Sequence, residues 1–298
     1  MPRRHISAMI ALCVALIPAP ARAGHYGEQE LLYRFADARI VESSGCVTHS
    51  SNPDVLFTHN DSGATELAVD NQLFAVGPNG ATLATYDLVP PARAAVDWED
   101  IARGPGSNGK PALFLADIGD NAPSTRPFVL VYEVPEPATF GNATVEPLTH
   151  VLVYEDGPHD AETFLVDPRD GTFAIVTKVN SGRSGVYVAQ QPLSSGVRIM
   201  RRVATLDFRL LASVGVGGFI WTTGGDIAPD RSQVVVRTYE EAFEWPVGDA
   251  PLEEVFTTPP ERFPLIDLGE AICYSTDGRA LITTAEGARA PVYRLAVQ

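Results

Sequence analysis

Short apolar runs separated by polar, glycine-containing turns recur along the whole chain. One such unit reads Asp97–Ile101, then a Gly/Pro-rich stretch, then the apolar run Leu113–Asp117. Four related units begin at Ser44, Asp160, Thr223 and Gly269. Short apolar runs bounded by turn residues are typical of β-strands. A degenerate strand repeat of roughly fifty residues indicates a radial β-repeat, so we predict an all-β fold, a five-bladed β-propeller.

The strand count predicts how this ring closes. Each of the first four units holds four predicted strands, the fourth unit ending with a strand at Leu252–Phe256, whereas the last unit holds three. A strand at Glu30–Ala36 precedes the first unit, and we expect it to complete the last blade, leaving no open seam between the chain ends. A six-bladed propeller is the alternative, because residues 208–221 have room for two more strands.

The first residues have the features of an export signal. Arg3 and Arg4 are followed by an apolar segment from Ile6 to Ile17 and by small residues up to Ala23. This order predicts a signal peptide at residues 1–23 and export to the periplasm or the extracellular space. We expect residues 24–298 to form a single domain, and no later apolar segment is long enough to span a bilayer.

Charge and composition narrow the possible partners. The formal net charge of −15 and the pI near 4.7 argue against nucleic acid and anionic membrane surfaces, although the same acidity also fits simple solubility. The chain has only two lysines, Lys110 and Lys178, but twenty arginines. This preference for arginine over lysine is typical of a GC-rich bacterial genome. We expect a monomer.

Two cysteines, Cys46 and Cys273, follow the leader. They fall in the opening strands of the first and last units, which become neighbours if the ring closes. In an oxidising compartment they form either a disulfide or two buried free thiols.

One oxygen-bearing residue per unit falls near the start of each predicted innermost strand, at one mouth of the ring. These residues are Ser44, Glu99, Glu162, Thr223 (or alternatively Asp226) and Glu270. Carboxylates crowded around a narrow axis repel one another, so either a cation lies among them, or some take up protons, or arginines pair with them. Hard oxygen donors favour calcium, which we predict as the bound ion. The alternative is that these side chains hydrogen-bond to backbone groups of neighbouring blades and hold the inner strands together.

The order of these motifs resembles a known family. The motifs are Glu42–Ser44, Asn60–Gly63, Glu99, His159–Glu162, Thr223–Gly225 and Gly269–Ile272. Their layout is similar to that of the soluble calcium-dependent apyrases, five-bladed propellers with a Ser/Glu/Glu/Ser/Glu ring around an axial calcium. Thr223 stands where that family has serine. The resemblance implies a calcium-dependent nucleotidase, and the motifs also resemble secreted bacterial propellers of unassigned activity.

Further polar residues follow the second predicted strand of each unit and are expected at the same mouth. Lys178 and Arg237 can hold a phosphate or carboxylate while Asp61, Asp117 or Asp120 activates a water. This set predicts a metal-assisted hydrolase of a small anionic substrate, a phosphoanhydride or phosphoester. For Lys178 the alternative is a salt bridge to Asp160 or Glu162. The alternative for the whole protein is a non-catalytic propeller that binds a glycan, a peptide or a protein.

Overall fold

Strands make up nearly all of the regular secondary structure in the described part of the chain, in agreement with the predicted all-β class. The computed structural model describes residues 26–61, 71–89, 97–121, 123–189, 196–212 and 220–298. Within these ranges it contains twenty-one strands and two four-residue helices. The predicted signal peptide lies outside the described residues.

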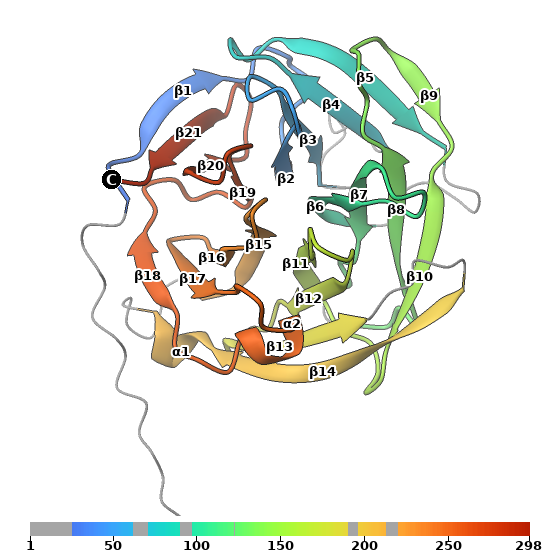
Figure 1. The fold of residues 1–298 in the computed structure, drawn as a ribbon, viewed down its shortest axis with the longest axis vertical. Helices are drawn as coiled ribbons and strands as arrows, with labels where there is room; N and C mark the ends of the chain where they lie inside the picture. Colours follow the sequence, from blue (N-terminus) through green and yellow to red (C-terminus); the bar gives the residue numbers. More distant parts are fainter. Residues whose placement is uncertain (1–25, 62–70, 90–96, 122, 190–195, 213–219) are drawn as a thin grey trace, which may run out of the picture.

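The described strands form four hydrogen-bonded sheets, arranged as Figure 1 shows. One sheet contains β2 (Ser43–Thr48), β3 (Leu56–Asn60), β4 (Gln72–Val76), β5 (Thr82–Leu88) and β9 (Ala143–Val145). The largest sheet contains β6 (Trp98–Pro105), β7 (Pro111–Asp117), β8 (Val129–Pro135), β10 (Leu148–Tyr154), β11 (Ala161–Val166), β12 (Phe173–Thr177), β13 (Arg183–Ala189) and β14 (Val197–Asp207). Parallel pairing of β10 with β14 joins its two halves.

Two four-stranded sheets complete the molecule. One contains β15 (Thr222–Ile227), β16 (Gln233–Thr238), β17 (Glu241–Pro246) and β18 (Glu261–Pro264). The other contains β19 (Ile272–Tyr274), β20 (Ala280–Thr284), β21 (Pro291–Ala296) and β1 (Glu30–Arg34). Because β1 pairs antiparallel with β21, the prediction that an N-terminal strand completes the last unit is confirmed.

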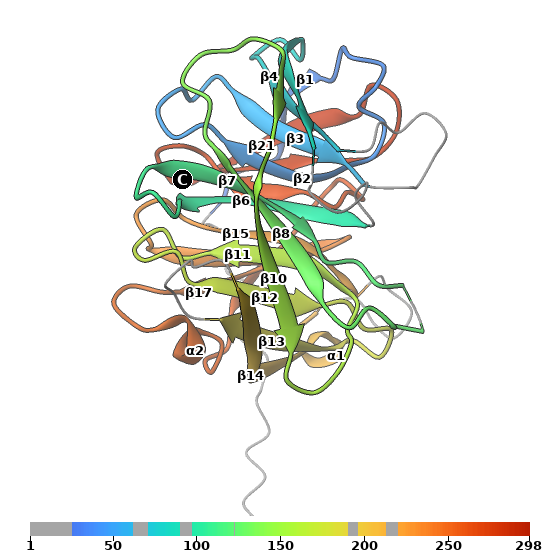
Figure 2. The same cartoon turned by 90° about the vertical axis from the view of Figure 1, so that its right-hand side faces the viewer.

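The strands that open the five units lie around a common centre. These inner strands are β2, β6, β11, β15 and β19 (Figure 1). Side chains hydrogen-bond across them: the Ser44 hydroxyl on β2 donates to the carbonyl of Glu99 on β6 over 2.6 Å. The eight-stranded sheet curves until its edge strands β6 and β11 lie side by side, which gives it a nearly closed, barrel-like course (Figure 2). The starts of the inner strands are thereby brought close to one another.

Aromatic and branched side chains between the sheets provide the core. Every residue of β2, β3, β11 and β12 is buried. Phe114 of β7 and Phe164 of β11 each meet the ring of Phe173 edge-on, at centroid distances of 5.3 and 5.2 Å. Strands buried on both faces explain why the sequence shows continuous apolar runs rather than strict alternation.

One predicted strand is wrong. Residues 252–256 do not extend the fourth unit, because Leu252–Val255 forms the helix α2, and the outer strand is β18. Leu252 and Val255, three residues apart, are both buried, which a helical turn allows. Pro251 precedes the helix, where its missing N–H costs no hydrogen bond. In the stretch 208–221, the described residues include the helix α1 (Phe208–Leu211).

Candidate functional site

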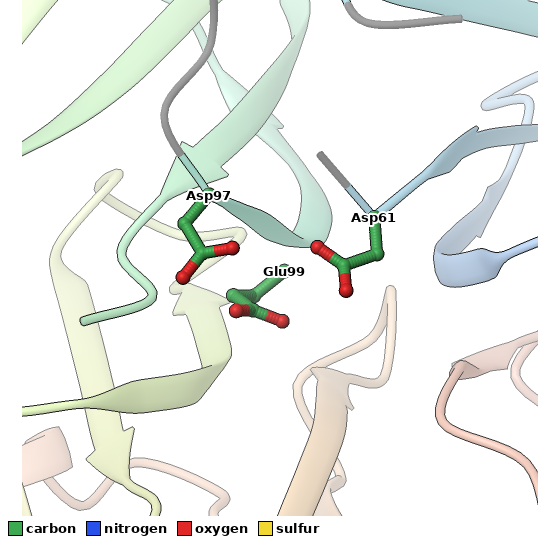
Figure 3. A group of neighbouring side chains, drawn as sticks. All are labelled: Asp61, Asp97 and Glu99. Atoms are coloured by element: carbon green, nitrogen blue, oxygen red, sulfur yellow. The ribbon is translucent and has the colours of Figure 1, made fainter. Parts of the chain in front are cut away.

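Three carboxylates from two neighbouring units meet at one end of the inner strands. Asp61 follows β3, Asp97 precedes β6, and Glu99 is the second residue of β6. One oxygen of each lies within 4.8 Å of the others, and Figure 3 shows the three carboxyl groups turned toward a shared space. Glu99 is 3% exposed, whereas Asp61 and Asp97 are half-buried. We call Asp61, Asp97 and Glu99 the carboxylate cluster.

Burial and mutual repulsion make negative charge costly here. Burial raises the pKa of Glu99 well above its usual range, and the charges of Asp61 and Asp97 raise it further. Burial, together with the nearby charge of Asp160, raises the pKa of Asp97 to about 6. Both shifts mean that the nearby positive charges, Lys178 for both groups and Arg126 for Asp97, do not fully offset the cost of ionising these carboxyls. A bound cation would supply the missing positive charge.

Gly119 leaves the space beside the cluster open. A Cβ atom at this position would lie 2.1 Å from Glu99 Oε1 and 2.4 Å from Asp97 Oδ2. The Gly119 amide also donates to the Asp97 carbonyl over 3.2 Å, which holds this loop against the start of β6. Any side chain at position 119 would therefore fill the space where the two carboxylates converge.

Glu270 joins the same acidic region from the last unit. Its charge raises the pKa of Glu99, and its Oε1 accepts a hydrogen bond from the Tyr239 hydroxyl over 2.7 Å. Burial and the adjacent Glu270 carboxyl raise the pKa of Glu286 to about 8. The cluster thus faces further acidic groups, whose charge the nearby Lys178 offsets only in part.

Lys178 is engaged with one of the predicted metal ligands. Its Nζ forms a short ion pair with Oε1 of Glu162, so the alternative prediction of a salt bridge is confirmed. Glu162 is 4% exposed, and its second oxygen, Oε2, is buried without a hydrogen-bond partner. One buried carboxylate oxygen at the start of β11 is therefore available to a ligand.

Ser44 and Thr223 link inner strands. The Ser44 hydroxyl donates to the Glu99 carbonyl over 2.6 Å, and the Thr223 hydroxyl donates to the Glu270 carbonyl over 3.3 Å. Both residues are fully buried. These hydrogen bonds agree with the alternative prediction, in which axial side chains hold the inner strands together.

Arg237, predicted to hold an anion, is buried and already paired with a carboxylate of the protein. The side chain is fully buried, and its Nη1 donates to Asp267 Oδ2 over 3.1 Å and to the Ala271 carbonyl over 2.9 Å. This guanidinium joins β16 to the segment before β19. The apolar strand that carries Arg237 turns it inward, where its partners are structural.

Asp117 and Asp120 hold a loop in place. The fully buried Asp117 pairs with Arg126 at 2.7 Å and accepts a hydrogen bond from the Tyr132 hydroxyl over 3.2 Å. Asp120 Oδ2 accepts a hydrogen bond from the Arg126 amide over 2.8 Å. Of the three predicted water-activating carboxylates, only Asp61 therefore belongs to the carboxylate cluster.

Sequence reasoning missed Asp97 as a site residue. Its position two residues before Glu99 is the signal that could have found it, since residues two apart on a strand share a face. Reasoning from sequence also missed the interstrand role of Asp100. Its Oδ2 accepts hydrogen bonds from the amides of Phe164 on β11 and Gly225 on β15, over 2.9 and 3.3 Å.

Comparison of the chain with protein-family models and with curated protein sequences found no match. In the part of the chain that the structure describes, neither helix has the length or the apolar character needed to cross a bilayer.

Proposed function

We propose that the protein is an exported five-bladed β-propeller that binds calcium at the carboxylate cluster and hydrolyses a small anionic substrate with its help. The observation that carries the proposal is the convergence of three carboxylates beside a glycine that leaves their shared space open. Phosphoanhydrides and phosphoesters are the first substrates to test.

The propeller architecture is supported by how the strands are grouped. Five inner strands surround one centre, each is followed outward by its own strands, and β1 completes the last group (Figure 1). Radial repetition of small sheets in this way is typical of propellers. Loops at one end of such a ring commonly form the binding site.

The donor atoms fit calcium. The cluster consists only of carboxylate oxygens, which hard divalent cations prefer. Calcium binds oxygens at about 2.3–2.6 Å, so ligands on opposite sides of one ion lie up to about 5 Å apart. The 4.8 Å limit on the separations within the cluster agrees with that geometry. Glu162, with its buried free oxygen, is a further candidate ligand.

A bound divalent cation would act as a Lewis acid that polarises an anionic substrate and offsets its repulsion by the acidic mouth. The chain's own part is to hold the carboxylates on the rigid ends of β3 and β6. Lys178, held by Glu162, adds one positive charge beside the cluster. Without the cation, this mouth would repel anions.

Calcium titration and activity measurements test the proposal. Calcium is titrated into metal-free protein and its binding is followed by calorimetry and by melting curves. Glu99→Gln and Asp97→Asn are each expected to weaken calcium binding at least tenfold. Asp249→Asn, which removes an exposed carboxylate, is the matched control and is expected to bind as the wild type does. Hydrolysis of nucleotides or phosphoesters should require calcium. Calcium binding that both cluster variants leave unchanged would contradict the site.

A non-catalytic binding role is the second candidate, and one observation favours it. The two basic residues predicted to hold an anion already have partners, since Arg237 is buried against Asp267 and Lys178 is paired with Glu162. Under this alternative, the calcium-loaded protein turns over no phosphoester, anhydride or lactone. It instead binds a glycan, peptide or protein, and Glu99→Gln weakens that binding.

A further inference from the structure

Two buried thiols lie in contact where the first and last units meet. Cys46 is on β2 and Cys273 is on β19, and the two residues are 1% and 0% exposed. Both are free cysteines, with their sulfur atoms 3.3 Å apart. Apolar side chains such as Phe35, Phe74 and Val292 surround them. The pair is thus shielded from water and held within reach of bond formation.

Hydrogen bonds on both sides of this pair fix the approach of the two units. The Thr48 hydroxyl on β2 donates to the Tyr274 carbonyl on β19 over 2.9 Å. On the other side, the hydroxyls of Ser43 and Thr284 lie 2.7 Å apart in a hydrogen bond. Because these contacts bracket the cysteines, the two backbones are held in place where the sulfurs meet. Disulfides require such close and well-aligned strands.

We propose that Cys46 and Cys273 form a disulfide that covalently joins the first and last units. The sulfurs need to approach from 3.3 Å to the bonded distance of about 2.05 Å, a shift that small side-chain rotations can provide. The inference is independent of the cation site, because no residue of the carboxylate cluster takes part. It requires only that the chain folds in an oxidising compartment.

The reaction is a thiol–disulfide exchange with a disulfide oxidant. One cysteine thiolate attacks the oxidant's disulfide and forms a mixed disulfide, releasing one thiol. The second cysteine thiolate then displaces the other half of the oxidant, so two protein thiols are oxidised as one disulfide is reduced to two thiols. Because the folded protein buries both sulfurs, the exchange is expected before the seam between β2 and β19 closes. A disulfide formed at this stage is then protected by the surrounding core.

Refolding with oxidised glutathione, compared with refolding under reductant, tests the proposal. Peptide mapping of the oxidised protein without reductant is expected to give one linked fragment containing Cys46 and Cys273, lighter by two hydrogens than its separated parts. Alkylation in denaturant should then label neither cysteine. Recovery of both cysteines as alkylated thiols from the folded, oxidant-treated protein would overturn the inference.

Thermal melting shows whether the disulfide stabilises the junction between β2 of the first unit and β19 of the last unit. Removing a disulfide from a domain of this size is expected to lower the melting temperature by about 10 °C, so oxidised protein should melt that much higher than reduced protein. The double variant Cys46→Ala/Cys273→Ala is the control, and its melting temperature should not respond to the oxidant. Equal melting of oxidised and reduced wild type would contradict a role for the bond at the seam.

Discussion

Glu99 and Asp100 are neighbours on β6, yet their carboxyl groups meet opposite surroundings. Glu99 faces Asp61 and Asp97, and their charges raise its pKa. Asp100 is fully buried and accepts backbone amide hydrogen bonds from its own strand and from two other inner strands. The difference teaches that partners, rather than residue type or burial, separate a structural carboxylate from a candidate ligand.

The same contrast extends to Asp226, the counterpart of Asp100 on β15. Its Oδ2 accepts a hydrogen bond from the Tyr274 amide on β19 over 2.8 Å, and its Oδ1 accepts one from the Ile227 amide. Asp100 and Asp226 therefore connect inner strands, whereas the carboxyl groups of Asp97 and Glu99 lie beside other carboxylates. Changes in the first set should alter stability, and changes in the second should alter cation binding.

Asp100→Ala is expected to have the largest effect on stability. It leaves the buried amides of Phe164 and Gly225 without their acceptor, at about 1–3 kcal/mol each, so the free energy of unfolding should fall by at least about 2 kcal/mol. Urea unfolding measures this loss, which should be the same with and without calcium. Asp100→Asn, which keeps one acceptor oxygen, should fall between the wild type and Asp100→Ala. An Asp100→Ala unfolding curve identical to that of the wild type would show that Asp100 does not stabilise the inner strands.

Asp226→Asn is expected to change how stability depends on pH. Burial raises the pKa of Asp226 from 3.8 to about 6. A carboxyl whose pKa is higher in the folded state stabilises the fold below the unfolded pKa and loses that contribution as pH rises to the folded pKa. At about 1.4 kcal/mol per pKa unit, the stability of the wild type relative to Asp226→Asn should fall by about 2 kcal/mol between pH 4 and pH 7, since the unfolded carboxyl is already more than half ionised at pH 4.

Urea unfolding at several pH values measures this difference. Asp249→Asn serves as the control, because its exposed carboxyl lies outside the inner strands and the variant should follow the wild type across the series. If the difference in unfolding free energy between the wild type and Asp226→Asn stayed constant with pH, burial would not raise the pKa of Asp226.

In the absence of calcium, Glu99→Gln should raise the free energy of unfolding, whereas Asp100→Ala should lower it. It removes one charge from a set of mutually repelling carboxylates, so the metal-free protein should become more stable by about 1 kcal/mol. Calcium at about one hundred times its dissociation constant should stabilise the wild type by about 2.7 kcal/mol, and the variant much less. Melting curves with calcium and with a chelator measure both effects. A metal-free variant less stable than the wild type would place Glu99 with the structural carboxylates.

Gly119→Ala is expected to have the smallest effect on stability. The added methyl group meets the ends of two flexible side chains, Glu99 and Asp97, which can move aside at a cost of about 1 kcal/mol or less. Calcium affinity should nevertheless fall about tenfold, because the carboxylates can no longer converge. Calorimetry measures the affinity and melting measures the stability. Unchanged affinity would show that the space beside Gly119 is not used by the ion.

Most strands could be predicted because each is an apolar run bounded by turn residues, and β1 could be assigned from the missing strand of the last unit. Residues 252–256 could not, since a five-residue apolar-acidic segment fits a helical turn as well as a strand. The site was only partly predictable. Asp61, Glu99 and the Lys178–Glu162 pair follow from their places at strand ends, but the inward direction of Arg237 depends on Asp267, thirty residues away.

The short strand β9 lies between β8 and β10 in sequence, yet it pairs with β5 of the preceding unit. On the other side, β14 of the third unit pairs with β10 of the second. Three consecutive units therefore interlock along the rim through exchanged strand pairings. Hydrogen exchange should accordingly register their opening as one cooperative event, and loss of the second unit would leave hydrogen-bonding edges exposed on both of its neighbours.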